Sequence, residues 1–414
     1  MKANFNTFLQ KGGVILRIAG IIAEYDPFHN GHAAHIANTR AENGGKATHI
    51  VTVISGNFTQ RGEPALVSKF HRAEMALTCG ADLVLELPLP WAMAPAEQFA
   101  AGGIAVLNAL GCIDFLSFGS ECGDTAALKQ LAALFDLPQY RRYIKDELAQ
   151  GIPYAAAGQK AAAKIVGDDI ALYLASPNNT LAIEYLRAMS KQGVDWDVFT
   201  LQRQGVKHNE KVPKDAFASA TLLREMIREG NLNLTNAYMP TESVSILNKA
   251  FDNGEITVQT SRLEYALLAH LRRLSPQEFA RLPWLSEGLE NRLYRASRTA
   301  MDYPSLLRDI KTRRYPMARL RRLLWASLIG LTDTDTKGTP PYIRVLGMNE
   351  RGREILSACQ PSLPIITRTS QIAALDERAQ RIFGLECAAT DLHTLAMERP
   401  LPCGCDHTTK LIVK

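Results

Sequence analysis

Two histidines stand three residues apart in the segment His29-Asn30-Gly31-His32, directly after the first long apolar run of the chain. At the start of a helix, two imidazoles with this spacing lie on one face, and the unpaired backbone N–H groups there add positive potential. Gly31 allows a ligand to approach the backbone closely. These features suit adenylyl transfer, in which donors aimed at phosphate oxygens stabilise the negative charge that develops around phosphorus.

The same histidine pair has two other interpretations. Residues at i and i+3 can bind a metal ion together, although no third ligand stands nearby in the sequence. The two imidazoles can also be structural, and a match of four residues often occurs by chance. The position of the motif, directly after an apolar run, favours the nucleotide-binding interpretation.

A second motif is the segment Ser219-Ala220-Thr221-Leu222-Leu223-Arg224. Hydroxyl groups at a helix start cap the helix or bind phosphate, and Arg224 follows Thr221 by three residues, on the same helix face. Taken alone, the segment predicts only a capped helix with a solvated arginine. Combined with the histidine pair, it predicts the second half of a triphosphate clamp, with Arg224 close to His29 and His32.

Apolar and β-branched runs at residues 14–25, 49–54, 81–87 and 115–118 predict buried strands. Helices are expected to begin near residue 32 and to span residues 70–79 and 97–110. This alternation predicts a parallel sheet with crossover helices. The polar segments EYDPFHNGH, SGN and GSE each follow a strand, and ligands of such sheets bind beyond the carboxyl ends of the strands.

A chain of 414 residues predicts two or three domains. We expect an N-terminal extension at 1–16, an ATP-binding domain at 17–240, a helical basic region at 241–335 and a small C-terminal domain and tail at 336–414. The expected fold class is α/β: a Rossmann-like parallel-sheet domain, then a helical arginine-rich region and a small C-terminal α/β segment. The Cys403-Gly404-Cys405 segment is expected to lie in a disordered tail.

Positive charge is concentrated in the helical basic region. Residues 261–322 contain 14 Arg or Lys and 6 Asp or Glu, a local net charge of +8 against +5 for the whole chain. Such a run is usually a solvated helix face. With Tyr294, Tyr303 and Tyr315 among the basic residues, it also suits contacts to a phosphate backbone and stacking on an exposed RNA base.

The bulk composition excludes several classes of protein. Hydrophobic residues make up 46% of the chain and charged residues 21%, which argues against disorder. Seven scattered cysteines, an odd number, indicate a reducing compartment rather than a disulfide framework. No apolar run reaches the roughly 18 residues that cross a bilayer, and no signal peptide is evident. We therefore expect a cytoplasmic protein without a membrane partner.

Six blocks of the sequence together resemble the tRNA(Met) cytidine acetate ligase family (TmcAL), within the HIGH-motif nucleotidyltransferase superfamily: EYDPFHNGH, SGNFTQRGEPALVSK, GADLVLELP, FGSE, SPNN and RYPMARLRR. The resemblance runs from about residue 18 to 370. It implies an ATP-dependent ligase that activates acetate as acetyl-adenylate. The acetyl group would then pass to the exocyclic amine of the wobble cytidine of elongator tRNA(Met). ATP is thus the expected nucleotide, with Mg²⁺ accompanying it.

The resemblance also implies which residues contact the nucleotide. Together with the hydroxyl motif, the expected set is Ile22, Ala23, Glu24, Tyr25, Asp26, Pro27, Phe28, His29, Asn30, Gly31, His32, Ala33, Ala34, His35, Gly119, Asn178, Asn179, Arg203, Ser219, Thr221 and Arg224. Only one of the two neighbouring asparagines is expected to match the family position. The family more often has Asn at position 26, so we expect the Asp26 carboxylate to point away from the phosphates or to help hold a metal ion.

Catalytic roles are expected for His29, His32, Lys69 and Arg224. His29 and His32 would stabilise charge on the α- and β-phosphates, and Arg224 with Thr221 would steady the leaving pyrophosphate. Activation of acetate also needs a cation beside the α-phosphate, which Lys69 or Arg61 could supply. The acetate pocket is expected around Ser55-Gly56-Asn57, at the end of a predicted strand.

Two other functions remain open on sequence grounds. The same fold could serve a small-molecule adenylyltransferase, although the basic region would then lack a purpose. The chain could also be a non-catalytic RNA-binding protein with a vestigial nucleotide site, against which the intact histidine pair and Arg224 argue.

Overall fold

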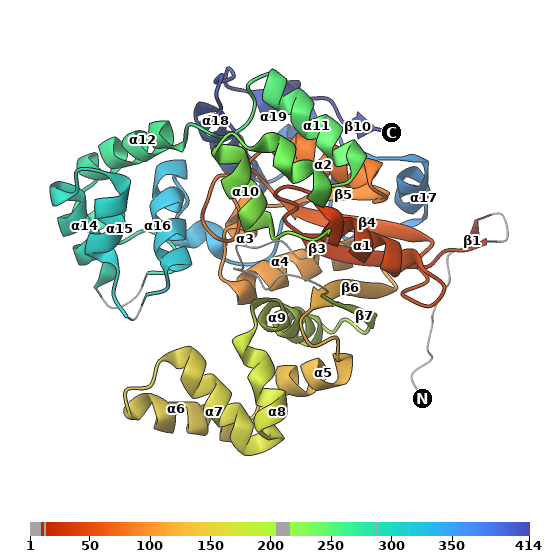
Figure 1. Cartoon of the computed structure of the whole chain (residues 1–414), viewed down its shortest axis with the longest axis horizontal. Coiled ribbons are helices and arrows are strands. Elements are labelled where there is room, and N and C mark those ends of the chain that lie inside the picture. Colours follow the sequence, from red (N-terminus) through yellow and green to blue (C-terminus); the bar gives the residue numbers. More distant parts are fainter. Residues whose placement is uncertain (1–9, 12–13, 204–215, 286–287, 314) are drawn as a thin grey trace.

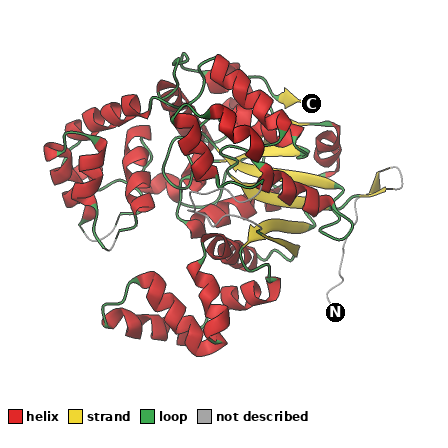
Figure 2. Ribbon diagram, in the orientation of Figure 1, coloured by secondary structure: helices red, strands yellow, loops and turns green. Residues whose placement is uncertain are grey.

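The computed structural model describes residues 10–11, 14–203, 216–285, 288–313 and 315–414. Most of the expected N-terminal extension lies outside these residues. In the described part, one mixed sheet of mostly parallel strands forms the centre of the molecule and helices surround it (Figures 1 and 2). The fold class expected from the sequence is confirmed.

The central sheet has the strand order β10-β8-β5-β4-β3-β6-β7, with β9 paired to β8. Its strands are β3 (Ile18–Ala23), β4 (His49–Ser55), β5 (Leu83–Leu87), β6 (Phe115–Ser120), β7 (Asp197–Gln202), β8 (Ile343–Met348), β9 (Ile365–Ile366) and β10 (Ile412–Val413). A separate antiparallel pair consists of β1 (Gln10–Lys11) and β2 (Val14–Ile15). All four predicted strands are present, but the first apolar run is divided between β2 and β3.

Each face of the sheet has its own hydrophobic core, because successive strand residues point to opposite sides. On β3, Ile18 and Ile22 belong to one core and Ala19 and Ile21 to the other. The first core packs against α4 (Ala96–Ala109), α9 (Pro177–Lys191), α17 (Glu350–Ala358) and α18 (Glu377–Leu395). The second packs against α1 (Asn30–Arg40), α2 (Lys69–Thr78), α10 (Ala220–Arg228) and α11 (Thr241–Asp252).

Two groups of helices project from the sheet (Figure 1). The first contains α5 (Thr125–Leu134), α6 (Pro138–Ala149), α7 (Tyr154–Val166) and α8 (Asp168–Ala171). The second, which we call the helical lobe, contains α12 (Thr260–Arg273), α13 (Pro276–Phe279), α14 (Leu289–Thr299), α15 (Tyr303–Ile310) and α16 (Met317–Ile329). The remaining helices are α3 (Leu89–Ala92) and α19 (Cys405–Thr408), with 3-10 turns η1 (Leu172–Ala175), η2 (Leu232–Tyr238), η3 (Asp333–Thr336) and η4 (Thr369–Ala374).

The C-terminal segment, expected as a small domain at 336–414, instead extends the central sheet. Its strand β8 pairs antiparallel with β5, and β9 and β10 both pair with β8. Nor is the Cys403–Cys405 region a disordered tail, because Asp406 of α19 is only 1% exposed. The segment was misassigned because a strand that enters the sheet antiparallel leaves no distinguishing pattern in the sequence.

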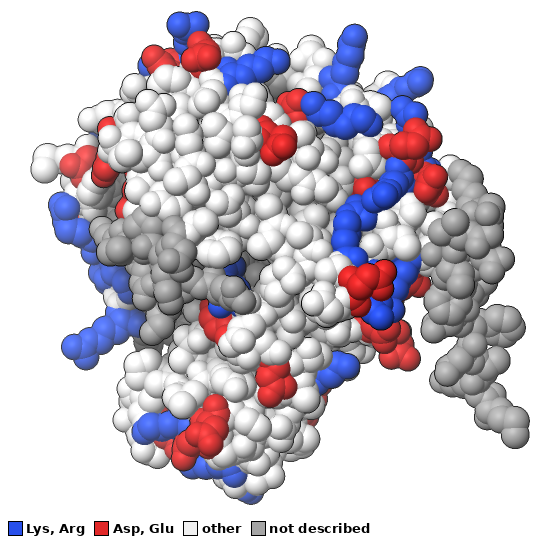
Figure 3. All heavy atoms as spheres, turned by 45° about the vertical axis from the view of Figure 1, so that its right-hand side comes forward, with Lys and Arg blue, Asp and Glu red and all other residues white. Residues whose placement is uncertain are grey.

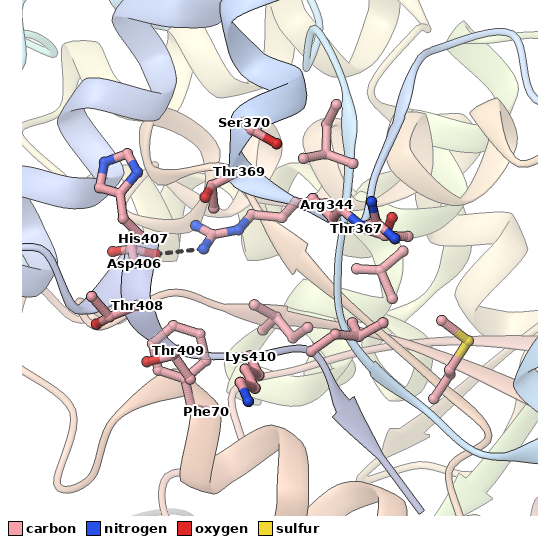
Figure 4. Close-up of a pocket in the computed structure, with 16 residues that line it drawn as sticks. Phe70, Arg344, Thr367, Thr369, Ser370, Asp406, His407, Thr408, Thr409 and Lys410 are labelled. Carbon is pink, nitrogen blue, oxygen red and sulfur yellow. Dashed lines mark ion pairs between the residues drawn. The ribbon is translucent and has the colours of Figure 1, made fainter.

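A buried cluster of charges connects this segment to the rest of the sheet. Asp406 lies 2.7 Å from Lys69 Nζ and 2.6 Å from Arg344 Nη2, and Figure 4 shows the Arg344–Asp406 ion pair beside a surface cavity. Lys69 and Arg344 also contact Glu86, at 2.7 and 2.9 Å, and Arg344 contacts Glu386 at 3.3 Å. Burial and the neighbouring Glu86 raise the pKa of Glu386 to about 8, which reduces the negative charge in the cluster.

We predict that Lys69→Met lowers the free energy of unfolding by about 3–5 kcal/mol, because it leaves Glu86 and Asp406 buried without this cation. Lys414→Met is the matched control: Lys414 pairs with Glu74 at 2.7 Å on the surface, and its loss should cost less than about 1 kcal/mol. The free energy of unfolding of both variants is measured by urea denaturation. If Lys69→Met and Lys414→Met lower it equally, the buried cluster does not hold the C-terminal segment in place.

Candidate nucleotide site

A cavity of about 250 Å³ lies at the carboxyl ends of β3, β6 and β7. Its lining comes from the loop after β3, from α1, α4, α9 and α10, and from the Gln60-Arg61 segment. Of the expected site residues, it brings together Ile22, Ala23, Glu24, Tyr25, Asp26, His29, His32, His35, Gly119, Asn178, Arg203, Ser219, Thr221 and Arg224. Arg224 thus shares one cavity with both histidines.

His29 and His32 contact each other at the start of α1, through a hydrogen bond and through ring stacking. The Nδ1 atom of His29 accepts a hydrogen bond from the Gly31 N–H at 3.1 Å, and His32 Nδ1 accepts the His29 N–H at 3.2 Å. The two rings stack with centroids 3.7 Å apart. Because each Nδ1 is an acceptor, the proton of a neutral ring must sit on Nε2, which leaves Nε2–H as a donor for a ligand.

Burial keeps the imidazoles of the cavity uncharged. It lowers the pKa of His29 to about 3, with help from Arg203 and Arg224. It also lowers the pKa of His32 well below its ordinary value, with His29 as the next cause, and the pKa of His35 to about 4, with Arg203 as the next cause. Before a ligand binds, the histidines therefore act as neutral donors, and the arginines supply the positive charge.

Arg224 joins helix α10 to the loop after β3. Its Nη1 donates a 2.6 Å hydrogen bond to the backbone carbonyl of Asp26, and its Nη2 donates to Thr221 Oγ1 at 3.3 Å. The Asp26 carboxylate lies 3.5 Å from Arg224 Nη1 and accepts the Leu66 N–H at 2.7 Å. Arg61 donates to Thr221 Oγ1 at 3.1 Å, so two guanidinium groups meet at one hydroxyl. The Asp26 carboxylate is thus engaged with Leu66 and Arg224 of the protein itself.

Glu24 is the other carboxylate of the cavity. Its Oε1 accepts the Gln60 N–H at 2.7 Å, which fixes the Gln60-Arg61 segment against the end of β3. Burial raises the pKa of this carboxyl, while the Gln60 hydrogen bond and the charge of Arg61 oppose the change. Glu24 therefore positions a segment that itself lines the cavity.

The structure distinguishes the two neighbouring asparagines. Asn179 is 1% exposed, and its Oδ1 accepts the N–H groups of Glu121 and Cys122 at 2.8 and 3.2 Å. Asn178 lines the cavity and donates to Glu121 Oε1 at 2.7 Å. Asn179 holds the loop after β6, whereas Asn178 is placed to meet a ligand. Hydrogen-bonding capacity is identical in the two residues, so sequence alone could not separate them.

Three residues expected to act in catalysis or in the acetate pocket lie elsewhere. Lys69 is fully buried in the charge cluster described above. Asn57 accepts the Lys69 N–H at 2.6 Å and donates to Thr390 at 3.1 Å, and Ser55 is 0% exposed. None of the three lines the cavity. The expected catalytic role of Lys69 is therefore corrected to a structural one, because a cation held by two buried carboxylates is not available to a ligand.

Several other expected residues support the cavity without lining it: Pro27, Phe28, Asn30, Gly31, Ala33 and Ala34. Asn30, for example, donates to the carbonyls of Ala216 and Ala237 at 3.0 and 3.2 Å. One wall of the cavity was not expected from the sequence; it is formed by Ala96, Phe99, Phe118, Leu181 and Tyr185. The apolar members of this wall look like ordinary core residues in the sequence, so no signal could have identified them.

The cavity has the composition of a nucleotide site. Arg61, Arg203 and Arg224 supply positive charge, and the two imidazoles add neutral donors at a helix start. The aromatic and aliphatic side chains of the wall formed by Phe99, Phe118, Leu181 and Tyr185 suit packing against the base or the sugar of a nucleotide. The fold and this cavity define a nucleotidyltransferase of the HIGH class, and a family model described as HIGH Nucleotidyl Transferase matches residues 16–403.

Curated relatives and solved structures narrow the assignment. The chain is 37% identical to the tRNA(Met) cytidine acetate ligase of Acetivibrio thermocellus, over 93% of this chain and 96% of the relative. It is 38% identical to that of Caldanaerobacter subterraneus, over 91% and 94%. Thermotoga maritima TmcAL is 31% identical over 96% of this chain and 99% of its own, with TM-scores of 0.89 for an apo crystal form and 0.87 for a form bound with alpha-thio ATP. The chain belongs to the tRNA(Met) cytidine acetate ligase family.

We predict that the buried imidazoles make the protein less stable in mild acid. For a histidine with a lowered folded-state pKa, such as His35 at about 4, the unfolded chain takes up the proton first as pH falls below about 6.5. Stability is therefore full above that pH and falls by up to about 1.4 kcal/mol per pH unit for each such histidine. In urea titrations from pH 7.5 to 4.5, His35→Gln should give a shallower slope than wild type. Identical slopes would contradict the assignment of a buried neutral His35.

Proposed function

We propose that this chain is an ATP-dependent ligase that converts acetate to acetyl-adenylate and transfers the acetyl group to the wobble cytidine of elongator tRNA(Met). The observation that carries the proposal is the meeting of His29, His32 and Arg224 in one cavity at the strand ends of a member of this family. Binding of alpha-thio ATP by Thermotoga maritima TmcAL supports ATP as the nucleotide.

In the first step, an acetate oxygen attacks the α-phosphorus of ATP and pyrophosphate leaves. The Nε2–H donors of His29 and His32 face the phosphates and stabilise the charge that develops there. Arg224 and Thr221 hold the leaving pyrophosphate, and Arg203 offsets the repulsion between acetate and phosphate. In the second step, the cytidine N4 amine attacks the acetyl carbon, AMP leaves and the amine loses a proton.

Magnesium enters with ATP in this scheme. The carboxylates of the cavity are already engaged, Glu24 by Gln60 and Asp26 by Leu66. Within the described residues, no group of three or more His, Cys, Asp or Glu side chains could hold a metal ion. Mg²⁺ bound with ATP would neutralise part of the charge on the phosphates. The residues of the cavity would then bind the ATP molecule and would not need to supply ligands to the magnesium ion.

The helical lobe is the proposed binding surface for tRNA. Residues 261–322 carry the local +8 charge. Lys and Arg side chains are visible along the left edge of the molecule in Figure 3, and the lobe lies on the left in Figure 1. No described helix is long and apolar enough to cross a membrane. We place the activity in the cytoplasm, where tRNA is available.

A single assay tests the proposal against its alternatives. The protein is incubated with ATP, labelled acetate and bulk tRNA, and label is measured in tRNA and in released nucleotide. Acetylated cytidine in tRNA is the expected result. Pyrophosphate release only with another small molecule would indicate a small-molecule adenylyltransferase, and tRNA binding without nucleotide turnover would indicate a non-catalytic protein.

We predict that His32→Asn lowers kcat for acetyl-adenylate formation by about 10²–10³-fold. The Asn amide oxygen can still accept the His29 N–H, so the helix cap is retained while the Nε2–H donor is lost. The affinity for tRNA should stay near wild type. His71→Asn is the matched control, because His71 pairs with Glu255 outside the cavity. Normal turnover in the His32 variant would refute the proposed role.

We also predict that tRNA binding weakens steeply with salt, since each neutralised phosphate releases counterions. Between 50 and 200 mM salt the affinity should fall by at least about 10²-fold if six or so basic residues contact phosphates. ATP binding in the interior cavity should change much less. Filter binding at a series of salt concentrations measures both. A flat salt dependence for tRNA would mean that the basic surface is only a solvated face.

A further inference from the structure

Helices α15 and α16 of the helical lobe enclose a surface hollow of about 580 Å³. Its apolar part is formed by Tyr303, Pro304, Leu307 and Met317, and its basic part by Arg308, Lys311 and Arg321. We call it the lobe hollow. An aromatic ring and aliphatic surface beside positive charge is the combination with which proteins hold unstacked RNA bases.

The walls of the lobe hollow are held in place by bonds within the protein. The Tyr303 ring packs on Trp325 with centroids 5.7 Å apart, so one edge is fixed. Lys311 Nζ donates to the carbonyls of Thr312 and Tyr315 at 2.7 and 2.8 Å, and Arg321 pairs with Glu63. Arg308, in contrast, is exposed. Together with hydrogen bonds from Ser305, its charge lowers the pKa of Asp302, but Arg308 forms no ion pair with another described residue. It is therefore the cation of the hollow that is available to an anion.

A second hollow, of about 660 Å³, adjoins the first and shares Arg308 with it. It is polar and is lined by Gly288, Asn291, Arg292, Arg295, Ala296, Thr299, Arg308 and Asp309. Arg295 is exposed and, like Arg308, has no ion-pair partner in the described part of the chain. An apolar aromatic hollow thus lies next to an arginine-lined one. A nucleotide presents the same pairing, a flat base joined to a phosphate.

The lobe hollow is also connected to the nucleotide cavity through one short loop. Arg321, on its rim, pairs with Glu63, and the next residue, Arg322, donates to the Gln60 carbonyl at 2.8 Å. Gln60 and Arg61 line the cavity. The loop packs closely on α16, since a Cβ atom added to Gly62 would lie 2.4 Å from the Arg322 backbone nitrogen. A ligand in the lobe hollow therefore lies near the loop that borders the ATP site.

We propose that the lobe hollow binds an unstacked nucleobase of the acceptor RNA that flanks the target cytidine, with its base against Tyr303 and its phosphate at Arg308. This inference rests on the proposed function. It adds a specificity site: a target cytidine can reach the cavity only after leaving its stack, and binding of its neighbour outside the cavity stabilises that unstacked state. The local +8 charge of the lobe favours a polyanion over an apolar peptide in this position.

The test uses the full-length protein and an anticodon stem-loop RNA with 2-aminopurine at each nucleotide beside the target cytidine in turn. The variants are Tyr303→Leu, which keeps apolar packing on Trp325, and Arg308→Ala. Tyr265→Ala is the matched control, because Tyr265 is a 66% exposed tyrosine of the same lobe that does not line the hollow. Three quantities are measured: 2-aminopurine quenching, kcat/KM for RNA acetylation, and ATP–pyrophosphate exchange with acetate.

Quenching at one flanking position is expected with wild type and with Tyr265→Ala, and should be lost with Tyr303→Leu. Loss of a base–aromatic contact should lower kcat/KM for RNA by about 5- to 100-fold, while the exchange reaction stays at the wild-type rate. If wild type acetylates RNA and Tyr303→Leu and Arg308→Ala match it, the base site is wrong. If the wild-type protein exchanges pyrophosphate but acetylates no RNA, the proposed function is refuted instead. If Tyr265→Ala lowers kcat/KM for RNA as much as Tyr303→Leu does, the surface is nonspecific and the base site is wrong.

Discussion

The hydrogen bond from Arg224 to the backbone carbonyl of Asp26 is the contact on which the nucleotide site depends. It joins two segments that are 198 residues apart, and both partners are buried. A buried guanidinium must have its donors satisfied, so its position is restricted to where carbonyl and hydroxyl oxygens meet it. Thr221 supplies that hydroxyl, whose oxygen also accepts a hydrogen bond from Arg61. These bonds together hold helix α10, the loop after β3 and the Gln60-Arg61 segment around a single cavity.

The chemistry of the cavity is divided between two kinds of donor. Burial and the neighbouring arginines remove charge from His29 and His32, whereas Arg203 and Arg224 lie at its wall as cations. Neutral imidazoles cost less to bury than imidazolium ions, and their Nε2–H groups can still donate to phosphate oxygens. A histidine pair at this position therefore gives direction to the ligand, and the arginines give most of the electrostatic attraction.

Much of this arrangement could be predicted from the sequence, and the failures have physical reasons. Apolar β-branched runs identified the parallel strands, and a strand before His29 placed the histidine pair at a strand end. Lys69 was misjudged because its partners, Glu86 and Asp406, are distant in sequence and neither shows a pairing pattern. The short strand β7 was not among the predicted strands. It is the last strand at one side of the sheet and only partly buried, so its apolar signal is weak.

The loop at 59–63 shows why the helical lobe and the nucleotide cavity cannot be regarded as independent parts. Its first half lines the cavity and is held by Glu24, and its second half packs on α16 through Gly62 and Glu63. The close contact at Gly62 leaves no room for a side chain between the loop and α16. The position of the Gln60-Arg61 segment is therefore set by the bond to Glu24 on one side and by the bond from Arg322 of α16 on the other.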